Sequence, residues 1–231
     1  YEPFLYKPAE ISAVFVTHAH IDHTGRLPKL LKEGFTGTVY STPPTRDFAK
    51  LLLLDSEHIL GQDADHDHRP HLYSINDIEN LMKQWRGVPY HETISLRTPG
   101  HPPVGEVTLY SAGHILGSAT IVVRAEGKTV VFSGDLGNSP SPLIGPSECP
   151  TDADYCIMES AYGNRVHESL ANRHQKLEAV ILETIRAGGC LMIPAFALER
   201  TQILLLELHD MFERHKIPAV PTFIDSPLAI K

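Results

Sequence analysis

The run from Thr17 to Gly25 constrains this chain more than any other stretch of its sequence. It reads Thr-His-Ala-His-Ile-Asp-His-Thr-Gly, so three histidines and one aspartate fall within six consecutive positions. The apolar segment 11–16 stands directly before it and is typical of a buried strand. We therefore predict a strand that ends at this run, with the histidines and the aspartate in the loop at its carboxyl end.

The side chains of this loop suit metal binding, because neutral imidazole and carboxylate are ligands for zinc and similar ions. Side chains two positions apart point the same way in an extended segment. We expect His18, His20 and Asp22 to face one side and His23 to turn toward a neighbouring position. This ligand density is enough for two adjacent metal ions and predicts a two-metal hydrolase site; an exposed polar loop is the alternative.

Two later segments place further candidate ligands at the ends of predicted strands. His114 lies between two glycines, which let the backbone turn so that a side chain can point into a site. Asp135 follows an apolar strand, where a charge without a partner is costly to bury and a bound metal would remove that cost. The alternatives are a core histidine with its hydrogen bonds satisfied and a turn aspartate.

Composition narrows the cellular context and the substrate. The 231 residues carry a formal net charge of −8, which counts against RNA or DNA as substrate, although bound metals would offset part of it. No apolar run approaches the ~20 residues that a membrane span requires. The three cysteines form no close pair, which favours a reducing cytoplasm over a disulfide framework.

Hydrophobic periodicity predicts an α/β protein in two parts. In the first part we expect strands at 11–17, 38–41, 93–96, 107–111, 120–124, 129–133 and 155–158, a hairpin turn at 125–128, and helices at 27–33, 45–60 and 74–84. In the second part we expect, in this order, a helix at about 168–187, a strand at 190–193, a helix at about 198–214 and a strand at 220–224. This is the pattern of a parallel unit with crossover helices. The acidic and histidine-rich segment 63–71 is expected to be a surface loop, with accessory metal binding as the alternative.

The joint pattern, His-x-His-x-Asp-His and then a single His and a single Asp at later strand ends, resembles the metallo-β-lactamase superfamily. The resemblance implies a four-layer αββα sandwich with the metals at the edge of its sheets. It also implies a role for each ligand: one zinc bound by His18, His20 and His114, a second bound by Asp22 and His23, and Asp135 as the bridge. The nucleophile would be a hydroxide held between the two ions, since paired ions lower the pKa of bound water.

The continuation of the first motif through Arg26-Leu27-Pro28 resembles the β-CASP branch of RNA-processing nucleases, in particular the mRNA 3′-end cleavage nuclease and its prokaryotic relatives. Segment 158–165 resembles the acidic motif A of that branch, and segments 193–202 and 225–229 resemble the start of its inserted domain. The resemblance implies that Glu159 orients a histidine that protonates the leaving oxygen. Glu159 and Asp22 are therefore the candidate catalytic residues. A turn carboxylate is the alternative for Glu159.

The chain departs from the family in having only ten residues before the first predicted strand and in lacking the later histidine motifs of the branch. We therefore expect a fragment, with residues 1–164 as an incomplete metallo-β-lactamase domain without its N-terminal strands. Residues 165–231 would be the truncated first part of a parallel α/β β-CASP domain. The isolated chain is expected to hold its second metal weakly and to be weakly active or inactive.

We predict zinc-dependent hydrolysis of RNA phosphodiester bonds in the cytoplasm, with RNA as partner, no membrane, and a homodimer or a processing complex as the assembly. Arg165 and Arg200 are candidate phosphate contacts, although we expect both to be solvated surface residues. The alternatives are a DNA nuclease, a hydrolase of small esters or thioesters and, from another class, an inactive RNA-binding subunit. The intact first ligand set argues against the last.

Overall fold

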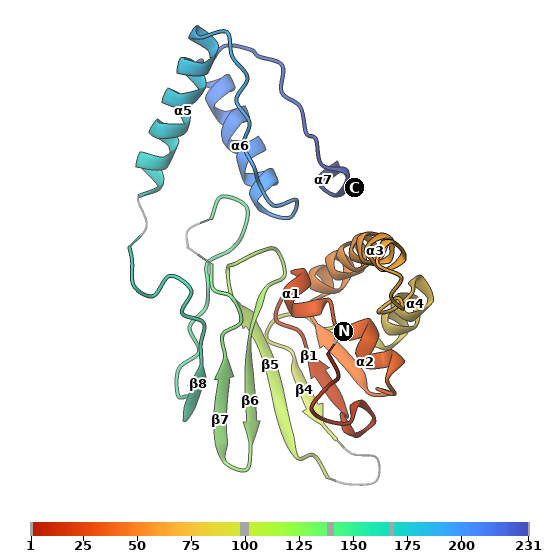
Figure 1. The fold of residues 1–231 in the computed structure, drawn as a ribbon. Coiled ribbons are helices and arrows are strands. Elements are labelled where there is room, and N and C mark those ends of the chain that lie inside the picture. The colour runs from red at the N-terminus through yellow and green to blue at the C-terminus, as the bar shows by residue number, and fades with distance from the viewer. Residues whose placement is uncertain (1, 98–101, 138–140, 167–168, 231) are drawn as a thin grey trace. The chain divides into compact units, whose positions relative to one another are not determined.

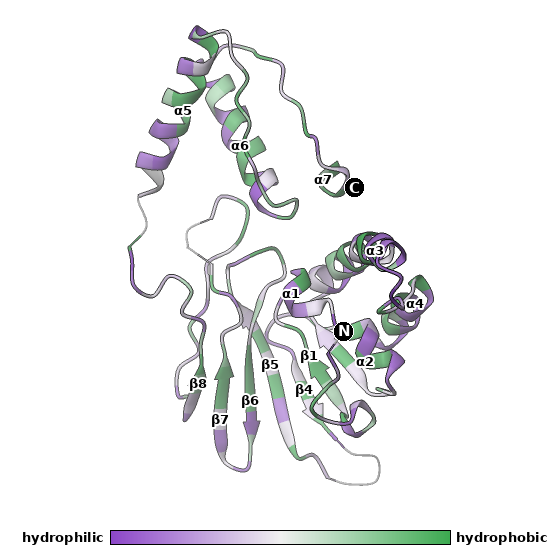
Figure 2. Ribbon diagram, viewed as in Figure 1, coloured by the Kyte–Doolittle hydropathy of each residue, from purple (hydrophilic) through white to green (hydrophobic). Residues whose placement is uncertain are grey.

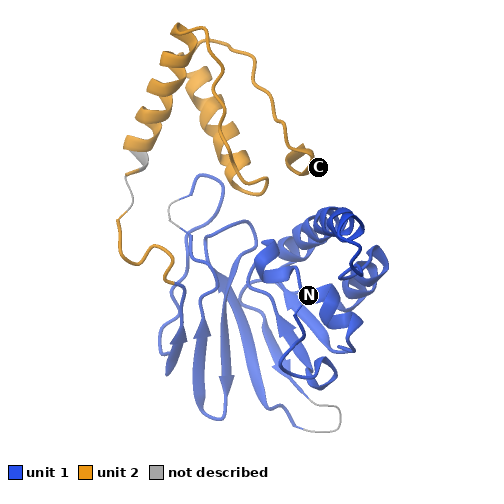
Figure 3. Ribbon diagram, viewed as in Figure 1, with its two compact units in different colours: residues 1–159 blue, residues 160–231 orange. Residues whose placement is uncertain are grey.

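The computed structural model divides the chain into two compact units, residues 1–159 and 160–231 (Figure 3). The residues that it describes are 2–97, 102–137, 141–166 and 169–230. Within them, the first unit contains a three-stranded sheet and a five-stranded sheet, and the second unit is helical. The mixed α/β character predicted from the sequence is confirmed for the first unit.

The three-stranded sheet is parallel and has the order β1-β2-β3. Its strands are β1 Ala13–Phe15, β2 Thr38–Ser41 and β3 Trp85–Gly87. The first two were predicted, although β1 is shorter than the apolar segment that contains it. The third was not, because three residues directly after a helix offer no alternation of apolar and polar side chains.

The five-stranded sheet has the order β4-β5-β6-β7-β8, antiparallel except for the parallel pair β7 and β8. All five strands were predicted, to within two residues at each end: β4 Thr93–Leu96, β5 Gly105–Ser111, β6 Ala119–Ala125, β7 Lys128–Phe132 and β8 Tyr155–Ile157. The predicted hairpin between β6 and β7 is also confirmed. Its two central residues, Glu126 and Gly127, have φ values of 52° and 71°, as a two-residue hairpin turn requires.

The two sheets pack face to face around an apolar core. Val107, Leu109 and Ile121 of the five-stranded sheet form part of a buried cluster, and Phe15 and Tyr40 of the three-stranded sheet pack against it. Figure 2 shows apolar residues along β1, β6 and β7. Burying a side chain of this size stabilises the fold by about 1.5–3 kcal/mol, so this interface is a main source of the unit's stability.

One edge of the five-stranded sheet extends beyond the three-stranded sheet. The strand register places Phe132 and Ile157 on the same face as Ile121, which is 4% exposed. Yet the two residues are 38% and 57% exposed. Within the described residues, the narrower sheet therefore leaves part of the inner face of the wider one uncovered.

Helices cover the other face of the three-stranded sheet (Figure 1). They are α2 Leu27–Lys32, α3 Pro43–His66 and α4 Ile75–Gln84, while η1 Pro8–Glu10 and α1 Ile21–Thr24 are single turns. Leu53, Ile78 and Leu81 are completely buried in this layer. The predicted start of α4 is confirmed, because Ser74 and Asp77 form a reciprocal capping box.

The prediction of a surface loop at 63–71 is wrong for its first part, because α3 continues to His66. Ala64 is completely buried, so packing extends the helix past the point where its polar composition predicted an end. The ligand-type side chains of this segment pair locally. His71 Nε2 lies 2.9 Å from Asp65 Oδ1, and Asp67 pairs with His66 and Arg69.

The second unit consists of α5 Leu170–Arg186, α6 Arg200–Glu213 and α7 Pro227–Ile230, joined by extended segments. Ile181, Met211 and Ile217 form its buried core. Helices α5 and α6 were predicted, and residue 168, where the first was expected to begin, lies outside the described residues. The strands predicted at 190–193 and 220–224 are wrong for this structure, because no neighbouring strand among the described residues pairs with their backbone N–H and C=O groups.

Glu199, directly before α6, is expected to reduce the stability of the second unit. It has φ 73° and ψ −57°, and Arg200 N–H donates to Leu198 O across it at 3.0 Å, which is a strained three-residue turn. Burial raises the pKa of its carboxyl group, and its Oε1 finds no hydrogen-bond partner among the described residues. Glu199→Gly is expected to raise the free energy of unfolding by about 1–2 kcal/mol, measured by urea denaturation.

The matched control is Glu199→Ala, which removes the buried carboxyl group but keeps the strained backbone. It should gain less than the glycine variant. A glycine variant that is less stable than the original chain would show that Glu199 makes a favourable contact.

Candidate metal centre

Three strands deliver ligand-type side chains to one edge of the sandwich. β5 and β7 run in the same direction because both are antiparallel to β6. His18, His114 and Asp135 each lie three residues beyond the last residue of their strand, after β1, β5 and β7 respectively. The expectation that these residues follow strand ends is confirmed.

Four of the predicted ligands converge. His18, His20, His114 and Asp135 each offer one ligand atom, and these atoms lie within 4.8 Å of one another. Nε2 of His18 and Nε2 of His114 lie 3.1 and 3.3 Å from Nδ1 of His20. Oδ2 of Asp135 lies 3.8 Å from both Nε2 atoms. These four residues are the only group of this kind in the part of the chain that the structure describes.

These separations fit a tetrahedral zinc ion. With ligand bonds of about 2.0–2.1 Å, tetrahedral geometry holds the ligand atoms about 3.3–3.4 Å apart. Four of the six separations, at 3.1–3.8 Å, bracket that value, and all four ligand atoms lie within 4.8 Å of one another. Three imidazole nitrogens and one carboxylate oxygen are also a donor set that zinc accepts in proteins.

A second group shares the same aspartate. His23 Nε2 lies 3.4 Å from Oδ1 of Asp135 and 3.5 Å from Oδ2 of Asp22. Asp135 thus presents one carboxylate oxygen to the three-histidine group and the other to His23. This is the arrangement that a carboxylate adopts when it lies between two neighbouring cation sites.

The extended loop predicted for this segment is wrong after His20, because α1 begins at Ile21. Thr24 stabilises the turn by donating its hydroxyl group to the carbonyl groups of Ala19 and His20. Asp22 therefore does not align with His18 and His20, and its side chain is 74% exposed beside His23. The helical turn separates the two groups of ligands, which an extended loop would have placed on one side.

His18 is held neutral and oriented. Its side chain is completely buried, and burial, followed by His23, His114 and His20, lowers its pKa from 6.5 to about 2. Neutral imidazole is the form that binds metal. Nδ1 of His18 lies 3.1 Å from Oγ1 of Thr17, and a proton shared on that side leaves Nε2 to face the other ligands.

The stability of the metal-free protein is expected to fall as the pH drops below about 6.5. The unfolded chain binds a proton at His18 near that pH, whereas the folded chain binds it only near pH 2, so acid favours unfolding. Between pH 6.5 and 5, His18 alone should remove about 2 kcal/mol. Urea denaturation at several pH values would measure this.

His18→Gln is the control for this prediction, since the variant keeps a polar side chain but does not titrate. Its free energy of unfolding should change less with pH than that of the unmodified chain, whatever its absolute value. Equal pH dependence in the two proteins would contradict the assignment of a strongly lowered pKa to His18.

Neighbouring hydroxyl groups and one glycine position the ligand loops. Oγ of Ser118 accepts hydrogen bonds from the backbone N–H groups of His114 and Ile115, at 3.0 and 3.2 Å. Gly134 has φ 57°, and a Cβ atom there would lie 2.7 Å from Cβ of Thr17. The sequence alone could not identify these serine and threonine residues, because both residue types are also common at exposed positions without such a role.

Glu159 lies beside the loop of Asp135. Its Oε1 accepts a hydrogen bond from Leu136 N–H at 3.1 Å, and its own N–H donates to Ser133 Oγ at 3.1 Å. Residues 133, 136 and 159 are thereby tied together next to a candidate ligand. Sequence alone placed Glu159 at a strand end, and the structure brings it next to the segment that carries Asp135.

The fold and this cluster together define an α/β sandwich protein with a candidate metal centre at its strand ends. The chain belongs to the metallo-beta-lactamase superfamily, whose family model matches residues 4–164. The superfamily and the sandwich fold inferred from the ligand motifs are confirmed.

Curated relatives match almost the whole chain. Ribonuclease TTHA0252 of Thermus thermophilus is 34% identical over 229 residues, which are 98% of this chain and 49% of that protein. Transcription termination factor FttA of Methanosarcina mazei is 34% identical over 234 residues, 96% of this chain and 35% of that protein. Cleavage and polyadenylation specificity factor subunit 3-I of Arabidopsis thaliana is 33% identical over 227 residues, 97% of this chain and 31% of that protein.

These relatives confirm the resemblance to the RNA-processing β-CASP branch. The chain spans about half the length of the first relative and about a third of the other two. Within the described residues, no helix combines the length and the apolar composition that crossing a membrane would require.

Proposed function

We propose that the protein to which this chain belongs hydrolyses RNA phosphodiester bonds with zinc. One observation carries the proposal: Asp135 lies between two groups of ligand-type side chains, with Oδ2 facing His18 and His114 and Oδ1 facing His23. The relatives support RNA as the substrate, since one is named a ribonuclease and another a subunit of a cleavage and polyadenylation factor.

The proposed roles of the residues follow from their positions. His18, His20 and His114 would hold a first zinc ion, Asp22 and His23 would hold a second, and Asp135 belongs to both groups. Bound zinc would supply an activated water molecule and stabilise charge on a phosphoryl oxygen. Asp22, whose carboxylate is largely exposed beside His23, is also proposed as a catalytic residue.

Glu159 is proposed to orient a general acid that protonates the leaving oxygen. Its backbone is tied to Ser133 and its carboxylate to Leu136, so it is held near Asp135. A carboxylate fixed in this way can accept a hydrogen bond from an N–H group and so orient it.

We further propose that residues 1–164 form the metallo-β-lactamase domain and that residues 165–231 begin an inserted β-CASP domain. The family match to residues 4–164 supports the first boundary. The proposed setting is RNA processing or decay in the cytoplasm, within a homodimer or a processing complex; the name of the Arabidopsis relative, a factor subunit, supports the complex.

Cleavage of end-labelled single-stranded RNA by the full-length protein tests this function. The zinc-loaded protein should cut RNA, and His20→Ala should abolish cutting, because His20 is the ligand shared by the shortest contacts of the cluster. Addition of a chelator should have the same effect, and zinc should reverse it.

The same assay separates the alternatives. Preferential cutting of DNA of the same sequence, or hydrolysis of small esters with intact RNA, would replace the proposed substrate. Binding of RNA without any cutting under zinc-loaded conditions would identify an inactive RNA-binding subunit. Unchanged cutting by His20→Ala would remove the metal mechanism altogether.

A further inference from the structure

The second unit contains a pocket that the proposed metal chemistry does not use. Its volume is about 660 Å³, within the range of pockets that hold small ligands. It lies between α5, α6 and the segment that leads into α6. Its lining residues are Arg173, Leu177, Pro194, Ala195, Phe196, Arg200, Ile203, Leu204 and Glu207.

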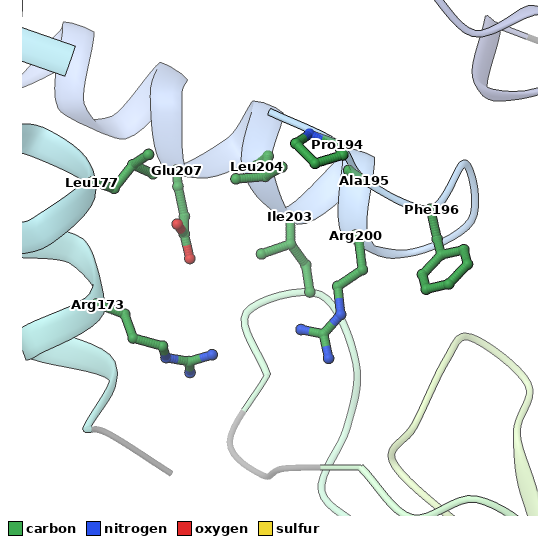
Figure 4. A pocket seen from close by; sticks show the side chains of 9 residues that line it. All are labelled: Arg173, Leu177, Pro194, Ala195, Phe196, Arg200, Ile203, Leu204 and Glu207. Carbon is green, nitrogen blue, oxygen red and sulfur yellow. The ribbon is translucent and has the colours of Figure 1, made fainter. Parts of the chain in front are cut away.

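Two arginines give the pocket its charge. Arg173 comes from α5 and Arg200 from the start of α6, and Figure 4 shows both guanidinium groups extending into the same open space. Neither guanidinium group forms an ion pair with a carboxylate in the part of the chain that the structure describes. In a chain with a net charge of −8, two such cations on adjacent helices form a local site for an anion.

Apolar and aromatic surface adjoins this charge. Leu177, Ile203 and Leu204 supply an aliphatic wall, and Phe196, which is 77% exposed, is also among the lining residues. A free phosphate or a carboxylate would use the arginines but not the aliphatic wall. A nucleotide would use both, because its phosphate pairs with guanidinium and its base stacks on an aromatic ring.

The one acidic residue of the pocket is fixed in place. Glu207 Oε1 lies 3.0 Å from His174 Nε2, and its side chain is only 16% exposed. A carboxylate so oriented repels phosphate from its own end of the pocket. It can instead accept a hydrogen bond from an amino group on a base edge.

We propose that this pocket is a binding subsite for one nucleotide of single-stranded RNA. Arg173 and Arg200 contact backbone phosphates, Phe196 stacks on the base, and Glu207 faces the base edge. The inference rests on the proposed function, because it names how the second unit holds the RNA substrate. It differs from the expectation that Arg200 is a solvated surface residue.

Binding of labelled single-stranded RNA to the zinc-loaded full-length protein tests the subsite, with phosphorothioate linkages to slow cleavage and fluorescence polarisation as the readout. Arg173→Ala/Arg200→Ala should weaken binding at least about 10-fold. It should also reduce the slope of log Kd against log salt by roughly 1.4, since each phosphate contact on a single strand contributes about 0.7. Phe196→Ala should weaken binding by roughly 10-fold with little change in slope.

The matched control is Arg186→Ala/Arg214→Ala. It removes the same charge from the far ends of α5 and α6, where both arginines are exposed. Affinity and salt slope should stay close to those of the unmodified protein. Arg173→Lys/Arg200→Lys should restore most of the salt slope, and thermal melting of every variant identifies any loss of folding.

The outcomes separate this inference from the proposed function. Equal binding by the pocket and control variants would overturn the subsite, even if RNA is cleaved. A pocket variant that melts several degrees lower but binds RNA normally would also overturn the subsite. The pocket residues would then stabilise the fold by contacts with the polypeptide chain rather than bind RNA. Weakened binding with a reduced salt slope supports the subsite, even if the unmodified protein binds RNA without cutting it.

Discussion

Asp135→Ala is expected to release zinc from the full-length protein and to lower RNA cleavage by more than about 100-fold. The two oxygens of this side chain face different ligand groups, at 3.8 Å from His18 and 3.4 Å from His23, so one substitution removes a ligand from both. Loss of a residue that only supports a ligand commonly costs 10–100-fold in metal affinity or activity, and the loss of a shared direct ligand should cost more. Elemental analysis and the RNA cleavage assay measure the two effects.

Asp47→Ala is the control for this prediction, because Asp47 is an exposed aspartate of the same unit that pairs only with Arg46 among the described residues. It should retain full zinc content and activity. Normal zinc content in Asp135→Ala would refute the shared role.

Gly137→Ala is expected to have the largest effect on stability, at least about 3 kcal/mol. A Cβ atom at this position would lie 1.6 Å from the carbonyl oxygen of Gly113, which is backbone and cannot move aside as a flexible side chain can. Gly137 N–H also donates to Ala112 O at 2.9 Å. The substitution therefore pushes apart the two loops that carry His114 and Asp135, and zinc binding should fall together with stability.

Gly145→Ala provides the comparison. No heavy atom lies within 4 Å of a Cβ atom at Gly145, so the free energy of unfolding of the variant should lie within about 0.5 kcal/mol of that of the original chain. Urea denaturation and zinc titration of the two variants measure both effects. A Gly137→Ala protein with normal stability would show that the two ligand loops can separate without cost.

Local patterns were enough to predict most of the first unit. Alternating or continuous apolar residues identified the strands of the five-stranded sheet, and the turn at Glu126 and Gly127 identified its hairpin. The same reasoning missed β3, whose identity as a strand comes from pairing with β2 rather than from its own three residues. It also ended α3 too early, because burial of Ala64 is a property of the packed helix layer.

In the second unit, local patterns predicted strands that the structure does not contain among the residues it describes. Apolar runs at 190–193 and 220–224 predicted strands, but a strand exists only where another strand meets its backbone groups. In the described residues of this unit those partners are not present, and Met192 and Phe223 are 85% and 87% exposed.

The sequence by itself determined the kinds of ligands and their places at strand ends, because residue type and hydrophobic period are local properties. The tertiary structure decided that His18, His20, His114 and Asp135 meet, and which oxygen of Asp135 faces which group. It also decided that α1 turns Asp22 away from His18 and that Arg173 and Arg200 share one pocket. These outcomes depend on contacts between residues that are distant in the chain or on a turn that packing selects, and no local pattern encodes them.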